Sequence, residues 1–202
     1  MSFVISIAVL LFSVSVHESA HGWMAEKFGD PTARLQGRIT LNPIKHIDPF
    51  GSIILPAMLA LLHAPVFGWA KPVIVNPYGL RNRRKAWMYI SAAGPASNLI
   101  LATIGGILFT IVRNLPFMIH PLVIYVLLVL VQLNVLLAIF NLIPVPPLDG
   151  SKILEGTLRG QALRTYEKIQ PYGFIILVLV IYTGIFNYIA TPIIMLVYRI
   201  LI

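Results

Sequence analysis

The 202-residue chain contains no cysteine and few charged residues. Without cysteine, disulfides and thiolate metal ligands are excluded, so any bound metal must be held by histidine, carboxylates or water. Only 11% of the residues are charged and 58% are hydrophobic, whereas about a quarter of the residues in a soluble domain are charged. This balance excludes an ordinary soluble domain and indicates an integral membrane protein.

Acidic residues are also scarce, with seven Asp and Glu against fifteen Lys and Arg. A basic excess can indicate nucleic-acid binding. Here the basic residues fall between apolar runs, where anionic lipid head groups and topology rules account for them. We therefore expect contacts with membrane lipids and no nucleic-acid partner.

Long apolar runs dominate the chain, and each spanning helix needs about 20 such residues. We expect about five transmembrane helices, at about 2–25, 86–112, 120–142, 170–186 and 187–202. A shorter run near 50–62 has Pro56 in its middle, which removes a helix donor, so we expect a re-entrant segment there. The predicted fold class is an all-α polytopic membrane protein.

Two polar segments between these runs have the composition of strands. Residues 34–43 and 67–80 contain β-branched side chains bounded by Gly, Asn and Pro. This pattern predicts short strands or a hairpin at the membrane edge.

The basic residues also predict orientation. Four of them lie at 81–85 and four more at 152–168, whereas the connection at 113–119 has only Arg113. Short cytoplasmic loops are enriched in Lys and Arg, so the first two regions are expected in the cytoplasm and the third outside.

The strongest chemical pattern is H-E-x-x-H, formed by His17, Glu18 and His21 within an apolar segment. Positions four apart on a helix differ by about 40° in direction and about 6 Å in rise, so both imidazoles can bind one cation with the carboxylate beside them. Ionisable groups inside a membrane are costly and are functional by default. A solvated position in the head-group region is the alternative, but it does not explain the spacing.

A catalytic zinc site commonly has three protein ligands and one water, so a third ligand is required. The best candidate is Asp149, because the prolines before it forbid regular helix and unwound backbone at membrane depth lines a cavity or is buried in protein. Asp149 could instead cap the helix that follows. The weaker candidates lack helical ligand spacing: His46, Asp48, His63 and His120.

A shared ion also constrains topology. Asp149 must lie at the same depth as His17 and His21, and helices 86–112 and 120–142 already provide two crossings. Segment 50–62 should therefore not cross. The site is expected towards the cytoplasmic side of a multi-pass protein of the cell membrane.

Three motifs together resemble those of the site-2 proteases, a family of intramembrane zinc metalloproteases. They are HESAH at 17–21 followed by AEKFGD, AAGPASN at 92–98, and FNLIPVPPLDG at 140–150, in the family's order. The resemblance covers about residues 10–155. It implies a compact member without a PDZ or nucleotide-sensing domain.

The resemblance also implies roles for individual residues. His17, His21 and Asp149 would bind one Zn²⁺ ion, and Glu18 would be the general base. Asn141 and Asn98 would contact the substrate backbone or stabilise the oxyanion. The substrate would be a transmembrane protein or peptide, extended at the cut, which segment 34–43 or 67–80 could bind as an added strand.

The chain is accordingly expected to form a single intramembrane protease domain, 1–202, with a catalytic core at about 1–155 and C-terminal helices at about 168–202. The main alternative is a transporter that passes a divalent metal or protons through the same His and Asp cluster. Transporters usually have paired repeats or broken helices in both halves, and the sequence shows neither. A non-catalytic protein that only binds peptide is a third possibility.

Overall fold

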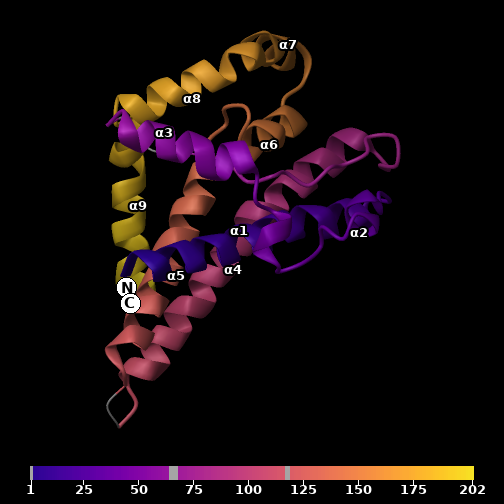
Figure 1. Cartoon of the computed structure of the whole chain (residues 1–202). Helices are drawn as coiled ribbons and strands as arrows, with labels where there is room; N and C mark the ends of the chain where they lie inside the picture. The colour runs from indigo at the N-terminus through magenta and orange to yellow at the C-terminus, as the bar shows by residue number, and fades with distance from the viewer. Residues whose placement is uncertain (1, 64–67, 117–118) are drawn as a thin grey trace.

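The computed structural model describes residues 2–63, 68–116 and 119–202, and in these ranges it contains helices and no strands (Figure 1). Within the described ranges, three helices are long and apolar enough to cross a membrane: α1 (Ser2–Lys27), α4 (Arg83–Arg113) and α5 (Pro121–Asn141). A bent pair, Gly160–Tyr182 with Ile185–Leu201, could add a fourth span. The all-α class is confirmed for the described residues.

Shorter helices fill the connections and the C-terminal part. They are α2 (Thr32–Leu35), α3 (Leu55–Leu61), α6 (Asp149–Thr157), α7 (Gly160–Ile169), α8 (Gly173–Tyr182) and α9 (Ile185–Leu201), with single helical turns or short wide turns at Pro43–Lys45, Pro49–Ile54 and Gln170–Tyr172.

Helix α4 lies at the centre of the bundle and packs against α1, α5, α6 and α9. Figure 1 shows α4 and α5 running side by side. Ala102 of α4 is buried against Val131 and Val135 of α5, while large side chains on other faces of α4, such as Ile100 and Ile107, are exposed. Such a helix suits a lipid environment, in which apolar side chains need no cover by protein.

The expectation of five spanning helices is not confirmed. The run at 170–186 forms mainly α8, a ten-residue helix that is about 15 Å long, half the thickness of a bilayer core. Gly184 has a positive φ of 74° at the boundary with α9, and the two helical parts are bent by 67°. The C-terminal runs therefore supply one broken span at most. The run near 50–62 forms the short apolar segment Pro49–Leu61, which is too short to cross as a helix.

The expected membrane-edge strands were wrong for the described residues. Segment 34–43 contains the end of α2 and turns, and residues 68–76 have no regular secondary structure; residue 67 lies outside the described ranges. The 68–76 amides bond to loops and side chains instead of another strand: Trp69 N–H donates to the carbonyl of Gly51 and Lys71 N–H to that of His46. Composition indicated extended backbone here, but no second strand pairs with it.

Asp30 fixes the far end of this segment to the end of α1. Its side chain is 1% exposed. One carboxylate oxygen accepts the N–H of Thr32 at 3.0 Å and its hydroxyl at 2.5 Å, and the other accepts the N–H of Asn76 at 2.6 Å. A buried carboxylate satisfied in this way holds 68–76 against α1.

Asp30→Ala should therefore lower the free energy of unfolding by about 3 kcal/mol, because buried donors lose a charged acceptor. Thermal unfolding in detergent and limited proteolysis of the 68–80 region would measure this. The control is Glu26→Ala, which removes an exposed ion pair with Arg34 and should cost less than about 1 kcal/mol. Equal stability of the two variants would contradict the anchoring role.

Candidate metal centre

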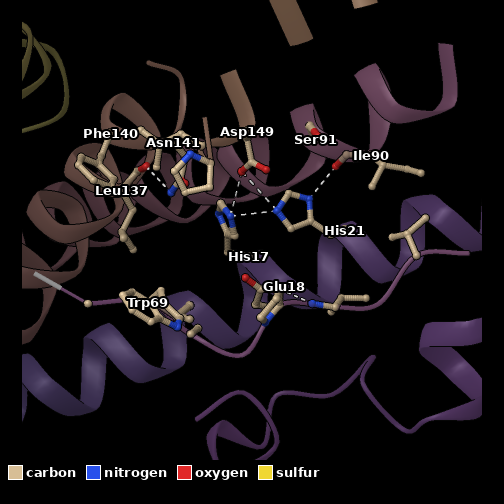
Figure 2. A pocket seen from close by; sticks show the side chains of 18 of the residues that line it. His17, Glu18, His21, Trp69, Ile90, Ser91, Leu137, Phe140, Asn141 and Asp149 are labelled. Atoms are coloured by element: carbon tan, nitrogen blue, oxygen red, sulfur yellow. Dashed lines mark hydrogen bonds and ion pairs between the residues drawn. The ribbon is translucent and has the colours of Figure 1, made fainter. Parts of the chain in front are cut away.

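Three predicted ligands from two distant segments meet at one point. His17 and His21 lie one turn apart on α1, and Asp149 is the first residue of α6. The Nε2 atoms of His17 and His21 are 3.0 Å apart. Asp149 Oδ2 lies 3.2 Å from Nε2 of His17 and 3.3 Å from Nε2 of His21. Figure 2 shows the three side chains pointing toward one another. A single ion placed between these atoms can reach all three.

The donor set fits a zinc ion. Asp149 Oδ2 is a buried oxygen with no hydrogen-bond partner, and two imidazole nitrogens face it. Two nitrogens and one carboxylate oxygen are common zinc ligands, and they leave a fourth position open. The helix-capping alternative for Asp149 does not hold, because Leu148 occupies the N-cap position and α6 has no side-chain cap bond.

The charge of Asp149 also suits a cation. Burial alone would raise the pKa of this carboxyl, but the adjacent imidazoles of His17 and His21 outweigh burial and hold the pKa below its ordinary value. The group is therefore ionised at neutral pH, as a metal ligand must be.

Helix α4 orients both histidines through contacts with their Nδ1 atoms, on the opposite side of each ring from the Nε2 atoms. His21 Nδ1 lies 2.7 Å from the carbonyl oxygen of Ile90, and His17 Nδ1 lies 2.6 Å from Oδ1 of Asn98. A carbonyl can only accept, so His21 carries its proton on Nδ1 and leaves the Nε2 lone pair free for a metal.

Gly94 allows α4 to approach this closely. A Cβ atom at this position would lie 2.5 Å from Cε1 and Nε2 of His21 and 2.6 Å from Cε1 of His17. The AAGPASN motif thus places its glycine directly against both imidazoles.

Glu18 and Asn141 line a cavity of about 620 Å³ that also contains the three ligands. Glu18 Oε2 accepts the N–H of Val73 at 3.0 Å, so the 68–76 segment runs beside the site and lines the same cavity. The Asn141 side chain donates one amide hydrogen to the carbonyl oxygen of Leu137, at an N···O distance of 3.0 Å. Its other amide hydrogen and its side-chain oxygen remain available to the cavity.

Asn98 does not line this cavity and is fully buried. Its oxygen is used by His17, and its Nδ2 donates to Oδ1 of Asn134 at 2.8 Å. This position favours an orienting role for Asn98 over the predicted contact with substrate.

The weaker histidine and aspartate candidates lie outside the cluster. His46 Nε2 bonds to the carbonyl of Thr40, Asp48 accepts the N–H of Gly51, and His120 accepts the N–H of Leu122 at the start of α5. Their roles are local. Sequence reasoning missed the Ile90 carbonyl and the Val73 amide, because no residue-type pattern reveals a backbone contact across 69 or 55 positions.

Apolar helices that carry a His, His, Asp cluster next to a glutamate define a class of protein, the helical membrane metalloproteases. The model of peptidase family M50 matches residues 117–183. "Putative zinc metalloprotease YwhC" of Bacillus subtilis is 39% identical over 192 residues, which is 92% of this chain and 84% of that protein. "Putative zinc metalloprotease Rip2" of Mycolicibacterium smegmatis is 32% identical over 185 residues, 92% of this chain and 69% of the relative.

No solved structure is significantly similar to the chain. The match to YwhC over most of both proteins shows the family: this chain belongs to peptidase family M50, the site-2 protease family. It is a membrane-embedded zinc metalloprotease, and its cofactor is zinc.

Gly94→Ala should weaken zinc binding without touching a ligand, because the added Cβ displaces both imidazoles. Zinc affinity of the purified protein, measured by competition with a chelating dye, should fall at least about ten-fold. The control is Gly79→Ala, whose Cβ would meet only ordinary contacts at 3.5 Å. Unchanged affinity in the Gly94 variant would show that α4 does not hold the histidines in place.

Proposed function

We propose that this metalloprotease hydrolyses peptide bonds of transmembrane proteins or peptides within the membrane, with Glu18 as general base and His17, His21 and Asp149 as zinc ligands. The observation that carries the proposal is the position of the cluster. The ligands lie among α1, α4 and the segment after α5, and His17 is 7% exposed. A buried polar site between apolar helices is suited to a substrate that is itself apolar.

A zinc ion bound here would polarise the scissile carbonyl and lower the pKa of a water molecule towards neutrality. Glu18 follows His17 directly and lines the same cavity, so its carboxylate is placed to accept a proton from the attacking water and pass it to the leaving amine. The free amide hydrogen of Asn141 would stabilise negative charge that develops on the carbonyl oxygen.

The 68–76 segment supports a mode of substrate binding. The amides of alternate residues, Trp69, Lys71 and Val73, all bond to the protein, and successive amides of an extended chain point to opposite edges. Among the described residues, the amides of Ala70 and Ile74 have no hydrogen-bond partner. An extended substrate could pair with this unoccupied edge beside the cavity.

The orientation of the site is part of the same proposal. Asp149 follows the end of α5 at Asn141, and the basic residues at 81–85 directly precede or begin α4. The stretch at 152–168, just after Asp149, and the stretch at 81–85 carry the positive charge typical of cytoplasmic loops. We place the active site towards the cytoplasmic side of the cell membrane.

Glu18→Gln tests the catalytic role. Glutamine keeps an oxygen that can accept the Val73 N–H but cannot take up a proton, so zinc content should stay at the native level while cleavage of a single-span model substrate falls about 100-fold or more. Metal analysis and a cleavage assay in proteoliposomes provide the two readouts. If the Gln variant cleaves at the native rate, Glu18 is not the general base. If the native protein does not cleave the substrate but takes up zinc into the proteoliposomes, the transporter alternative is favoured.

Ile74→Pro tests the unoccupied edge. Proline removes the free amide but leaves the Trp69, Lys71 and Val73 bonds, so cleavage of a membrane substrate should drop about ten-fold or more through loss of substrate pairing. Zinc content should not change. The matched control is Ile74→Ala, which keeps the amide and shortens only the side chain; if both variants cleave equally well, the edge does not bind substrate.

A further inference from the structure

A line of buried polar side chains runs from the metal centre into the bundle. Ser13 on α1, Asn98 on α4 and Asn134 on α5 are each 0% exposed. We call these three residues the buried amide network. Asn134 Nδ2 lies 2.8 Å from Oγ of Ser13, and Asn98 Nδ2 lies 2.8 Å from Oδ1 of Asn134. The network ends at His17 Nδ1, 2.6 Å from Asn98 Oδ1.

The hydrogen bonds of this network have one possible direction, and a backbone carbonyl sets it. Asn134 Nδ2 also lies 2.8 Å from the carbonyl oxygen of Leu130. That oxygen can only accept, so the Asn134 side chain must present its NH₂ group to Leu130 and its oxygen to Asn98. Asn98 must then turn its NH₂ group to Asn134.

This orientation leaves the Asn98 oxygen facing His17. An oxygen there requires a proton on His17 Nδ1, and a neutral imidazole with that proton has its lone pair on Nε2. Nε2 is the atom that faces His21 and Asp149. If the Asn98 amide were reversed, its N–H would require the lone pair on Nδ1, and Nε2 would carry the proton instead.

Packing alone does not account for an asparagine at position 134. The neighbouring buried positions Val131 and Val135 on α5 are apolar and 1% and 2% exposed. A polar amide among them is costly in lipid unless it is fully paired. Its donors and its oxygen are paired only through Leu130, Ser13 and Asn98, that is, through the network itself.

We propose that Asn134 is a positioning residue that fixes the Asn98 amide and thereby the tautomer of His17, so that Nε2 is ready to bind zinc. The proposal rests on His17 being a zinc ligand, and it does not depend on the nature of the substrate. It assigns a role in metal binding to two residues, Ser13 and Asn134, that no motif in the sequence marks.

Asn134→Leu removes the group that orients Asn98 at similar volume. We expect the zinc dissociation constant of the purified protein, measured in detergent by chelator competition, to rise about ten-fold, the lower end of the effect of residues that orient metal ligands. Val135→Ala is the control. It shortens a similarly buried side chain on the same helix, and it should lower the melting temperature of the metal-free protein while zinc affinity stays within two-fold of native.

Testing Asn134→Leu in an Asn98→Asp variant separates loss of the Asn98 amide orientation from a general loss of structure. In Asn98→Asp both side-chain oxygens accept, so His17 Nδ1 meets an acceptor whichever way the group turns. Adding Asn134→Leu to Asn98→Asp should therefore cause no further loss of zinc affinity. A loss of the same size in both backgrounds would overturn the proposal, as would native affinity in Asn134→Leu alone.

His17→Ala provides the remaining comparison. If it leaves zinc affinity unchanged, the metal site itself is wrong, whereas a large loss with no effect of Asn134→Leu rejects only the role of Asn134. Should the Leu variant not accumulate as folded protein, Asn134→Ser, which is smaller and polar but too short to reach Asn98, takes its place with the same criteria.

Discussion

The approach of Asp149 to His17 and His21 is the contact on which the rest of the structure depends. It joins a site at the end of the α1 apolar run to the turn after α5, and α4 lies between these elements and packs on both. Because a zinc ligand must lie about 2 Å from the ion, small rotations of α1 or α6, which carry the donors, would separate them. The small Gly94 against both imidazoles and the Ile90 carbonyl behind His21 are consequences of this requirement.

The same requirement explains the polar groups in an otherwise apolar bundle. Unpaired donors and acceptors are expensive where water is scarce, and the amide groups of Asn98 and Asn134 are paired across helices. Asn98 and Asn134 connect α4 to α5, and Ser13 connects α5 to α1. These bonds also restrict the rotation of each helix about its axis, which apolar packing alone specifies weakly.

Residue patterns predicted the parts of this protein that depend on local spacing. The His17 and His21 pair follows from helical periodicity, the three long helices from apolar length, and Asp149 from prolines that prevent helix before it. Two short C-terminal runs were counted as spans because composition does not reveal the break at Gly184. Strands were expected at 67–80 because β-branched residues indicate extended backbone, but a strand needs a partner, and pairing is set by the tertiary fold. The contact between Asn98 and Asn134 depends on the rotation of two helices and was equally out of reach.

The bond between Glu18 and the Val73 amide links the chemistry to the substrate. One edge of the 68–76 segment is held by the protein at Trp69, Lys71 and Val73, and the third of these bonds ends on the proposed base. A peptide that pairs with the opposite edge would therefore lie on the same short piece of backbone that positions Glu18. Substrate position and base position are then fixed by one element, and a shift of this segment would change both together.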